Sequence, residues 1–153
     1  GKNTMKLHLL TLFFIFSTCA CAPQQKRNAD ISVSYEDEVV YEVQSGWNTQ
    51  SDLIKASSDT EKEFYVIFSA SWCKSCKILK NVIDKMGWRD KVLMLNSEHK
   101  WVQELAAAAE LEGIPQMFVV GPNRTDKNST FVGASEISWE LFDVFERKKK
   151  KGK

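Results

Sequence analysis

The chain holds its four cysteines as two close pairs, Cys19 with Cys21 and Cys73 with Cys76. Cysteines that staple a small secreted domain are scattered along the sequence, so each of these pairs needs its own explanation. Cys73 and Cys76 stand where an apolar run gives way to a helical pattern. Thiols at this spacing can close a disulfide across one helical turn without moving the backbone, which predicts redox chemistry.

The predicted helix supplies a reason for the two thiols to differ. Cys73 would lie at the helix N-terminus, where unpaired backbone N–H groups and the helix dipole favour a thiolate by roughly 0.3–2 kcal/mol. Lys74 adds a positive charge that water and salt partly screen. Cys76, one turn further on, would be less accessible. We therefore predict that Cys73 attacks and that Cys76 resolves the mixed disulfide.

A zinc half-site is the alternative explanation of a lone Cys-x-x-Cys motif. A closed zinc site takes about four ligands. The chain offers only two histidines, His8 in an N-terminal apolar segment and His99, and no second cysteine pair near Cys73 and Cys76. We therefore expect no metal and no other cofactor, and we interpret His99 as a surface residue.

Apolar patterns identify the elements that must position the cysteines. Residues 64–68 form a continuous β-branched and aromatic run, as in a strand covered on both faces. After Cys76, apolar residues recur at three- and four-residue steps as far as Met86, and Gly87 follows as a stop. The cysteine pair therefore lies between a buried central strand and an amphipathic helix.

The rest of the sequence alternates strand and helix patterns. We predict further strands at residues 39–43, 92–95, 117–120 and 130–132, and further helices at residues 49–57, introduced by Asn48, 101–111 and 137–145. The fold class is therefore α/β, with a central mixed sheet flanked by helices. The length allows one domain, and the net charge of +1 gives no reason to expect a nucleic-acid partner.

The N-terminal segment has the order of an export signal. A methionine and a lysine precede an apolar run at residues 7–16 and then small residues, and this run is shorter than the roughly 20 residues of a membrane span. We divide the chain into a signal peptide at residues 1–21, a flexible linker at 22–38, a domain at 39–146 and a basic tail at 147–153. Cleavage before Cys21 resembles bacterial lipoprotein processing, although Thr18 replaces the usual leucine. Lipidation of Cys21 and simple secretion both stay open.

The sequence around the second cysteine pair resembles the thioredoxin family. Trp72 precedes the first cysteine, Lys77 follows the second, and Ile114-Pro115 stands further along the chain. The resemblance covers roughly residues 39–145 and implies the thioredoxin fold.

The same resemblance implies roles for residues around the cysteines. Pro115 should follow a cis peptide and lie against the cysteine pair, with the backbone of Ile114 available to pair with a substrate strand. Trp72 should cover the active site, and Gly133 matches the family's glycine after the last hairpin.

Three departures from the family pattern bear on mechanism. Ile67 stands where thioredoxins usually keep a buried acidic residue, so deprotonation of Cys76 must rely on water, another side chain or the partner. Lys74 and Ser75 replace the usual Gly-Pro. Asn81 stands where the family often has a helix-kinking proline, which predicts a straighter helix.

The resemblance implies a thiol-disulfide oxidoreductase that acts on disulfide-containing protein substrates and needs a redox partner to regenerate its cysteine pair. We expect reduction or isomerisation rather than oxidation, because strongly oxidising members tend to carry a histidine between the cysteines. The alternative is a binding or assembly module with little redox turnover.

The signal predicts an extracytoplasmic protein of a bacterial periplasm or cell envelope, membrane-anchored or secreted. The basic tail predicts contact with anionic lipid or, more commonly, a solvated and disordered end.

Overall fold

A four-stranded sheet forms the middle layer of the computed structural model, which describes residues 34–124 and 129–152. The strands are β1 (Phe64–Ser69), β2 (Leu93–Asn96), β3 (Gln116–Val120) and β4 (Thr130–Val132), in the order β2-β1-β3-β4. β1 pairs parallel with β2 and antiparallel with β3, and β4 pairs antiparallel with β3. The predicted α/β class with a mixed central sheet is confirmed. The predicted signal peptide, Cys21 and most of the predicted linker lie outside the described residues.

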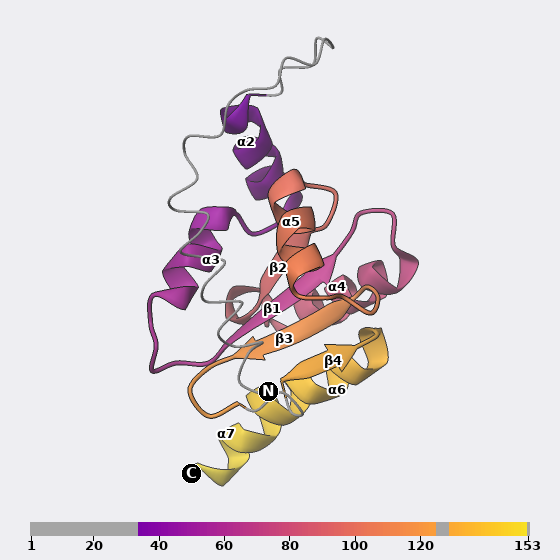
Figure 1. Cartoon of the computed structure of the whole chain (residues 1–153). Helices are drawn as coiled ribbons and strands as arrows, with labels where there is room; N and C mark the ends of the chain where they lie inside the picture. Colours follow the sequence, from indigo (N-terminus) through magenta and orange to yellow (C-terminus); the bar gives the residue numbers. More distant parts are fainter. Residues whose placement is uncertain (1–33, 125–128, 153) are drawn as a thin grey trace.

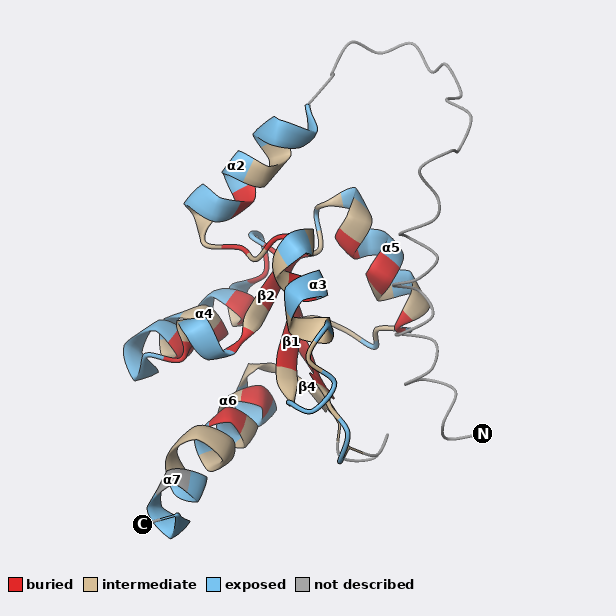
Figure 2. Ribbon diagram, turned by 90° about the vertical axis from the view of Figure 1, so that its left-hand side faces the viewer, coloured by how far each residue is buried: buried red, intermediate tan, exposed pale blue. Residues whose placement is uncertain are grey.

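Helices cover both faces of this sheet (Figure 1). On one face, Tyr65 and Ile67 of β1 pack with α4 (Lys74–Met86) and α6 (Ala134–Phe142). On the other face, Val66 and Phe68 pack with α3 (Gln50–Ser57) and α5 (Lys100–Ala108). Successive strand residues point to opposite faces, so a strand buried on both sides must be apolar throughout. Figure 2 shows the resulting buried residues along β1.

Helix α4 carries the second cysteine and holds it against the sheet. Its residues Leu79 and Ile83 are fully buried. The helix is continuous through Asn81 and ends at Gly87, whose φ of 68° is a left-handed conformation that favours glycine. The predicted amphipathic helix after Cys76 is therefore confirmed.

The strand predicted at residues 39–43 is wrong, because this segment belongs to helix α2 (Tyr35–Ser45). Ser34 caps the helix by accepting the N–H of Asp37, acidic residues occupy the first turn, and Gly46 ends the helix with a φ of 78°. The β-branched Val39, Val40 and Val43 give this segment the composition of a strand, but the helix buries Glu42 and leaves most of its apolar residues exposed. The folded chain therefore begins before residue 38, where the predicted linker ended.

The segment after α2 reaches the open edge of β2. Thr49, and not Asn48, caps α3, through a reciprocal capping box with Asp52. The backbone N–H of Asn48 donates to the Met94 carbonyl at 2.8 Å, and its side-chain oxygen accepts the Met94 N–H at 2.9 Å. Asn48 thus satisfies part of a strand edge that would otherwise be open to another chain.

The C-terminal helix extends further than predicted. α6 passes through a π-helical segment, η3 (Asp143–Arg147), into α7 (Lys148–Lys151), and a short 3-10 helix, η1 (Arg89–Lys91), joins α4 to β2. The disordered end expected for the basic tail is therefore wrong for residues 148–151, because the preceding helix propagates into them and an Arg147–Asp143 ion pair supports it. Of the helices in the described ranges, none combines the length and the apolar character that a membrane span requires.

Candidate active site

Cys73 and Cys76 form a disulfide at the N-terminus of α4, with their Cα atoms 5.2 Å apart. Cys73 is the N-cap residue, and its sulfur accepts the backbone N–H of Cys76 at 3.3 Å. Cys73 is 6% exposed and Cys76 is 2% exposed. Cys73 is the more exposed of the two, as predicted, but the difference in exposed fraction is small. Access to both sulfurs therefore depends on the loops around them.

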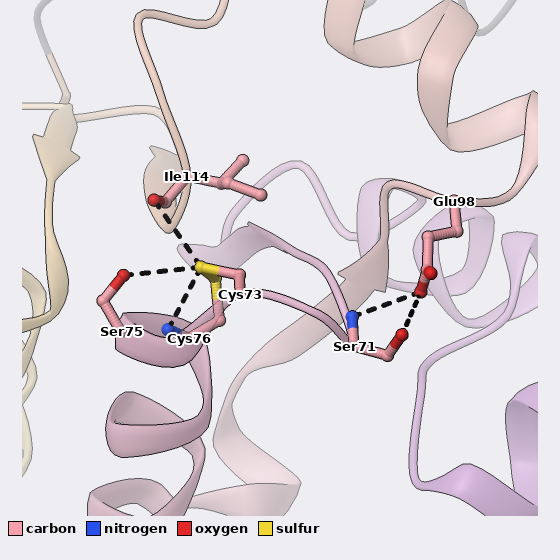
Figure 3. The surroundings of a disulfide bond; sticks show 6 residues. All are labelled: Ser71, Cys73, Ser75, Cys76, Glu98 and Ile114. Carbon is pink, nitrogen blue, oxygen red and sulfur yellow. Dashed lines mark hydrogen bonds between the residues drawn. A yellow bond between two sulfur atoms is a disulfide. The ribbon is translucent and has the colours of Figure 1, made fainter.

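Ser75 is the polar side chain that sequence reasoning missed. Its Oγ lies 3.4 Å from the Cys73 sulfur (Figure 3). A disulfide sulfur carries no proton, so the hydroxyl must be the donor in this contact, and after reduction the same hydroxyl can donate to a thiolate. A hydroxyl two residues past a helix N-cap is a signal that sequence could have supplied. Lys74, the first residue of α4, is exposed.

The peptide between Ile114 and Pro115 is cis, as the resemblance implied. The Ile114 carbonyl oxygen lies 3.9 Å from the Cys73 sulfur, and the Ile114 side chain packs against the cysteine pair. Gly133, whose φ is 94°, donates its N–H to the Pro115 carbonyl at 2.9 Å. The structure therefore places Ile114 beside the disulfide and bonds the following Pro115 to Gly133.

Glu98 holds the loop that precedes Cys73. Its carboxylate accepts the Ser71 hydroxyl at 2.6 Å and the Ser71 backbone N–H at 3.2 Å (Figure 3). These hydrogen bonds, the Ser71 hydroxyl first, lower the pKa of Glu98. The fully buried Asn96 accepts the backbone N–H of Glu98 at 3.1 Å. No local pattern predicts this contact, because its partners are 27 residues apart.

Trp72 lies beside the buried sulfurs but faces solvent. It is 69% exposed, and Ile78 on α4 is 54% exposed. A large exposed aromatic next to a reactive pair offers apolar contact area to a partner. The role of Trp72 as a cover over the site stays a prediction.

Ile67 puts an apolar side chain into the core at the position where the resemblance implied a buried acidic residue. Its side chain is fully buried with Leu79 and Ile83 of α4. At the end of the same strand, Ser69 is 1% exposed and its hydroxyl has no hydrogen-bond partner among the residues that the structure describes. The proton of Cys76 must therefore leave by another route than the buried acid of typical thioredoxins.

His99 is not the surface residue that we predicted, because its side chain is only 11% exposed. It forms a hydrogen bond with Glu38, and its Nε2 lies 3.6 Å from a Glu42 oxygen. Trp101 donates its indole N–H to that same oxygen at 3.1 Å. Burial raises the pKa of Glu42. We call Glu38, Glu42, His99 and Trp101 the α2–α5 junction; it ties α2 to α5 and contains neither cysteine.

The side chains that could bind a metal do not gather. Across residues 34–124 and 129–152, no group of three His, Cys, Asp or Glu residues lies close enough together to hold a metal ion. The polar groups around the Cys73 sulfur are instead a hydroxyl, a backbone N–H and a carbonyl. The hydroxyl and the N–H can donate to a thiolate and so stabilise it, whereas the carbonyl oxygen can only accept.

Comparisons with known proteins find a family and similar solved structures for this chain. A family model described as Thioredoxin matches residues 43–142. The reduced thioredoxin pre-protein of Schistosoma mansoni superposes with a TM-score of 0.50 at 16% identity, over 66% of this chain and 92% of that chain. The germline-specific thioredoxin Deadhead of Drosophila melanogaster gives a TM-score of 0.48 at 21% identity, over 64% of this chain and 94% of that chain. No curated protein sequence matches the chain.

Proposed function

We propose that this chain, which belongs to the thioredoxin family and is a thiol-disulfide oxidoreductase, reduces or isomerises disulfides in protein substrates. The observation that carries the proposal is the Cys73–Cys76 disulfide at the N-terminus of α4, beside the cis Ile114-Pro115 peptide. The residues between the cysteines, Lys74 and Ser75, include no histidine of the kind that strongly oxidising members tend to carry.

In the reducing direction, the cycle starts from two thiols. The Cys73 thiolate attacks one sulfur of the substrate disulfide, so that a mixed disulfide forms and the other substrate sulfur leaves as a thiolate and takes up a proton. Cys76 then attacks the Cys73 sulfur, breaks the mixed disulfide and releases the second substrate thiol. The substrate has gained two electrons and two protons, and the protein holds the Cys73–Cys76 disulfide seen here.

Continued reduction needs a source of electrons. A dithiol redox partner returns two electrons and two protons to the Cys73–Cys76 disulfide by the same exchange in reverse. Isomerisation consumes no electrons, because a freed substrate thiolate attacks the mixed disulfide and displaces Cys73. An oxidising compartment therefore permits isomerisation only while a partner keeps the pair reduced.

Three features favour the Cys73 thiolate. The helix N-terminus and its dipole contribute roughly 0.3–2 kcal/mol, the Ser75 hydroxyl is positioned to donate to the sulfur, and Lys74 adds a screened positive charge. Cys76 is buried and Ile67 at the family's acidic position is apolar, so the departing substrate thiolate is the acceptor that we assign to the Cys76 proton.

We further propose that the protein acts outside the cytoplasm of a bacterium, anchored to a membrane by lipid on Cys21. The charged, apolar and small residues in succession at residues 1–21 support this proposal. Intact-mass measurement in a bacterial host should show an acylated product that begins at Cys21, and Cys21→Ser should remove the acyl mass. A processed product without acyl groups would contradict the anchor, and an unprocessed product from Met5 would contradict export as well.

Trapping of mixed disulfides tests the proposed cycle. Cys76→Ala should accumulate mixed disulfides with substrate proteins, because no thiol remains to release them. Cys73→Ala should accumulate few, because the remaining Cys76 lies inside α4 and lacks the N-cap position that favours the Cys73 thiolate. Non-reducing electrophoresis of cells that express each variant reads the result, and the double variant Cys73→Ala/Cys76→Ala gives the background.

Two outcomes would change the conclusion. Equal trapping by both single variants would contradict the assigned roles of the two cysteines. Trapping by neither variant, in cells where the protein is abundant, would favour the binding or assembly module with little redox turnover. The apolar Ile67 at the acidic position of the family is the observation that favours this second function.

A further inference from the structure

Gln116 is a buried polar residue at the start of β3, immediately after the cis proline. It is 2% exposed, and its side-chain oxygen accepts two backbone N–H groups, that of Glu112 at 2.8 Å and that of Gly113 at 3.4 Å. An amide buried so completely is costly unless it is hydrogen-bonded. Gln116 meets this requirement by bonding the turn that leads into Ile114.

This turn lies outside the regular helices and strands. Helix α5 ends at Ala108, Glu110 takes a left-handed φ of 53°, and Glu112 is exposed to solvent. The backbone of Gln116, in contrast, pairs with Phe68 on one side and with Val132 on the other, so it is fixed in the sheet. The Gln116 side chain therefore transfers the rigidity of the sheet to residues 112 and 113.

Ile114 is consequently held from both directions. Gln116 binds the two peptide groups that precede it, and Gly133 donates to the carbonyl of Pro115, which follows it. Between these anchors the Ile114 carbonyl lies 3.9 Å from the Cys73 sulfur and is directed toward it (Figure 3). A shift of the 112–114 segment would move this carbonyl relative to the reacting sulfur.

We infer that Gln116 is a positioning residue for disulfide exchange with protein substrates. The side-chain carbonyl of Gln116 fixes the position of the Gly113–Ile114 segment. The substrate backbone lies along this segment while the substrate disulfide reacts with Cys73. The inference rests on the proposed function. A small disulfide has no chain to lay along this segment, so it reaches the sulfur without this help.

The test compares two substrates on three variants of the full chain. Gln116→Met keeps the volume but removes the carbonyl acceptor, Gln116→Asn keeps an amide that is one methylene too short, and Gln116→Glu keeps an acceptor at the original reach. The pre-reduced proteins are mixed with insulin, a protein disulfide, or with hydroxyethyl disulfide, and exchange is followed by acid quenching and alkylation. Gln116→Met and Gln116→Asn should lower the rate constant for insulin by about tenfold while changing that for hydroxyethyl disulfide less than about twofold. Gln116→Glu should restore the insulin rate.

The outcomes separate this inference from the proposed function. An equal fall of the rate constant for both substrates would show that Gln116 has only a structural role and would overturn the inference. An insulin rate constant for Gln116→Glu as low as that for Gln116→Met would overturn it as well. Because Gln116→Asn retains a polar side chain, it keeps the test valid if Gln116→Met does not fold. Failure of the unmodified protein to exchange with insulin, while it exchanges with hydroxyethyl disulfide, would instead overturn the action on protein substrates.

Discussion

Glu98 beside the active site and Glu42 in the α2–α5 junction both tie one element to another, yet they lie in opposite environments. Glu98 is exposed and accepts two hydrogen bonds from Ser71, whereas Glu42 is 2% exposed and receives the indole N–H of Trp101. Hydrogen bonding lowers the pKa of the first carboxyl, and burial raises the pKa of the second. The loop at the cysteines is thus held by the exposed carboxylate of Glu98, and α2 is held by the buried carboxyl group of Glu42.

This difference gives the two regions opposite responses to pH. The lowered pKa of Glu98 means that its contribution to stability is present above the ordinary value of 4.5 and is lost as the pH falls through the lowered value. The raised pKa of Glu42 means that the folded state retains the proton, so stability falls as the pH rises from 4.5 through the raised value. A lower pH therefore stabilises the α2–α5 junction and weakens the hydrogen bonds between Glu98 and Ser71.

The largest effect is expected from Trp101→Phe in the junction. The variant removes the indole N–H that Glu42 accepts and leaves a buried carboxyl short of a donor, which should lower the free energy of unfolding by about 1–3 kcal/mol. Denaturant unfolding measures this change. Exchange activity per folded molecule should persist, because the junction contains neither cysteine.

Trp139→Phe is the matched control. Trp139 on α6 is 66% exposed and makes an edge contact with Phe142, so this variant should change the free energy of unfolding by less than about 0.5 kcal/mol. Equal destabilisation by the two substitutions would contradict a specific role for the Trp101–Glu42 hydrogen bond.

A smaller effect is expected from Glu42→Gln, which keeps an oxygen acceptor for Trp101 but cannot titrate. The loss of stability that Glu42 causes as the pH rises from 4.5 should disappear. Relative to the unmodified protein, the variant should therefore gain stability as the pH rises above 4.5, as measured by urea unfolding. A difference between the two proteins that does not change with pH would show that Glu42 is not the titrating group.

The smallest effect on stability is expected at the active-site loop, from Ser71→Ala. The variant removes the hydroxyl donor at 2.6 Å, so the pKa of Glu98 should rise toward its ordinary value in an NMR titration. Because Glu98 is exposed, the free energy of unfolding at neutral pH should change by less than about 0.5 kcal/mol. An unchanged pKa of Glu98 would contradict the role given to the Ser71 hydroxyl.

The cysteine site could be predicted from sequence because its parts are local. Residues 64–68 are apolar throughout, the cysteines follow at one-turn spacing, and the helix after them shows its period as far as Gly87. What sequence could not provide is the pair of side chains that fix the surrounding loops. Glu98 reaches Ser71 across 27 residues, and Gln116 bonds a turn whose path depends on the sheet.

The α2–α5 junction was not predicted, for a different reason. The β-branched valines of α2 favour a strand, and the helical signals, Ser34 before it and Gly46 after it, are short-range features that this composition outweighed. The partners of Glu42, His99 and Trp101, come from a helix far along the chain. Burial of a carboxylate in place of valines is a tertiary outcome, and periodicity carries no information about it.

The central claim is that Cys73 and Cys76 together exchange disulfides with proteins. The most direct measurement is reduction of insulin by the full chain with dithiothreitol as electron donor, beside Cys73→Ala, Cys76→Ala and dithiothreitol alone. We predict that the unmodified chain accelerates reduction well above dithiothreitol alone and that Cys73→Ala abolishes the acceleration, because it removes the attacking thiol. An unmodified chain no faster than dithiothreitol alone, or a Cys73→Ala variant as fast as the unmodified chain, would contradict the account.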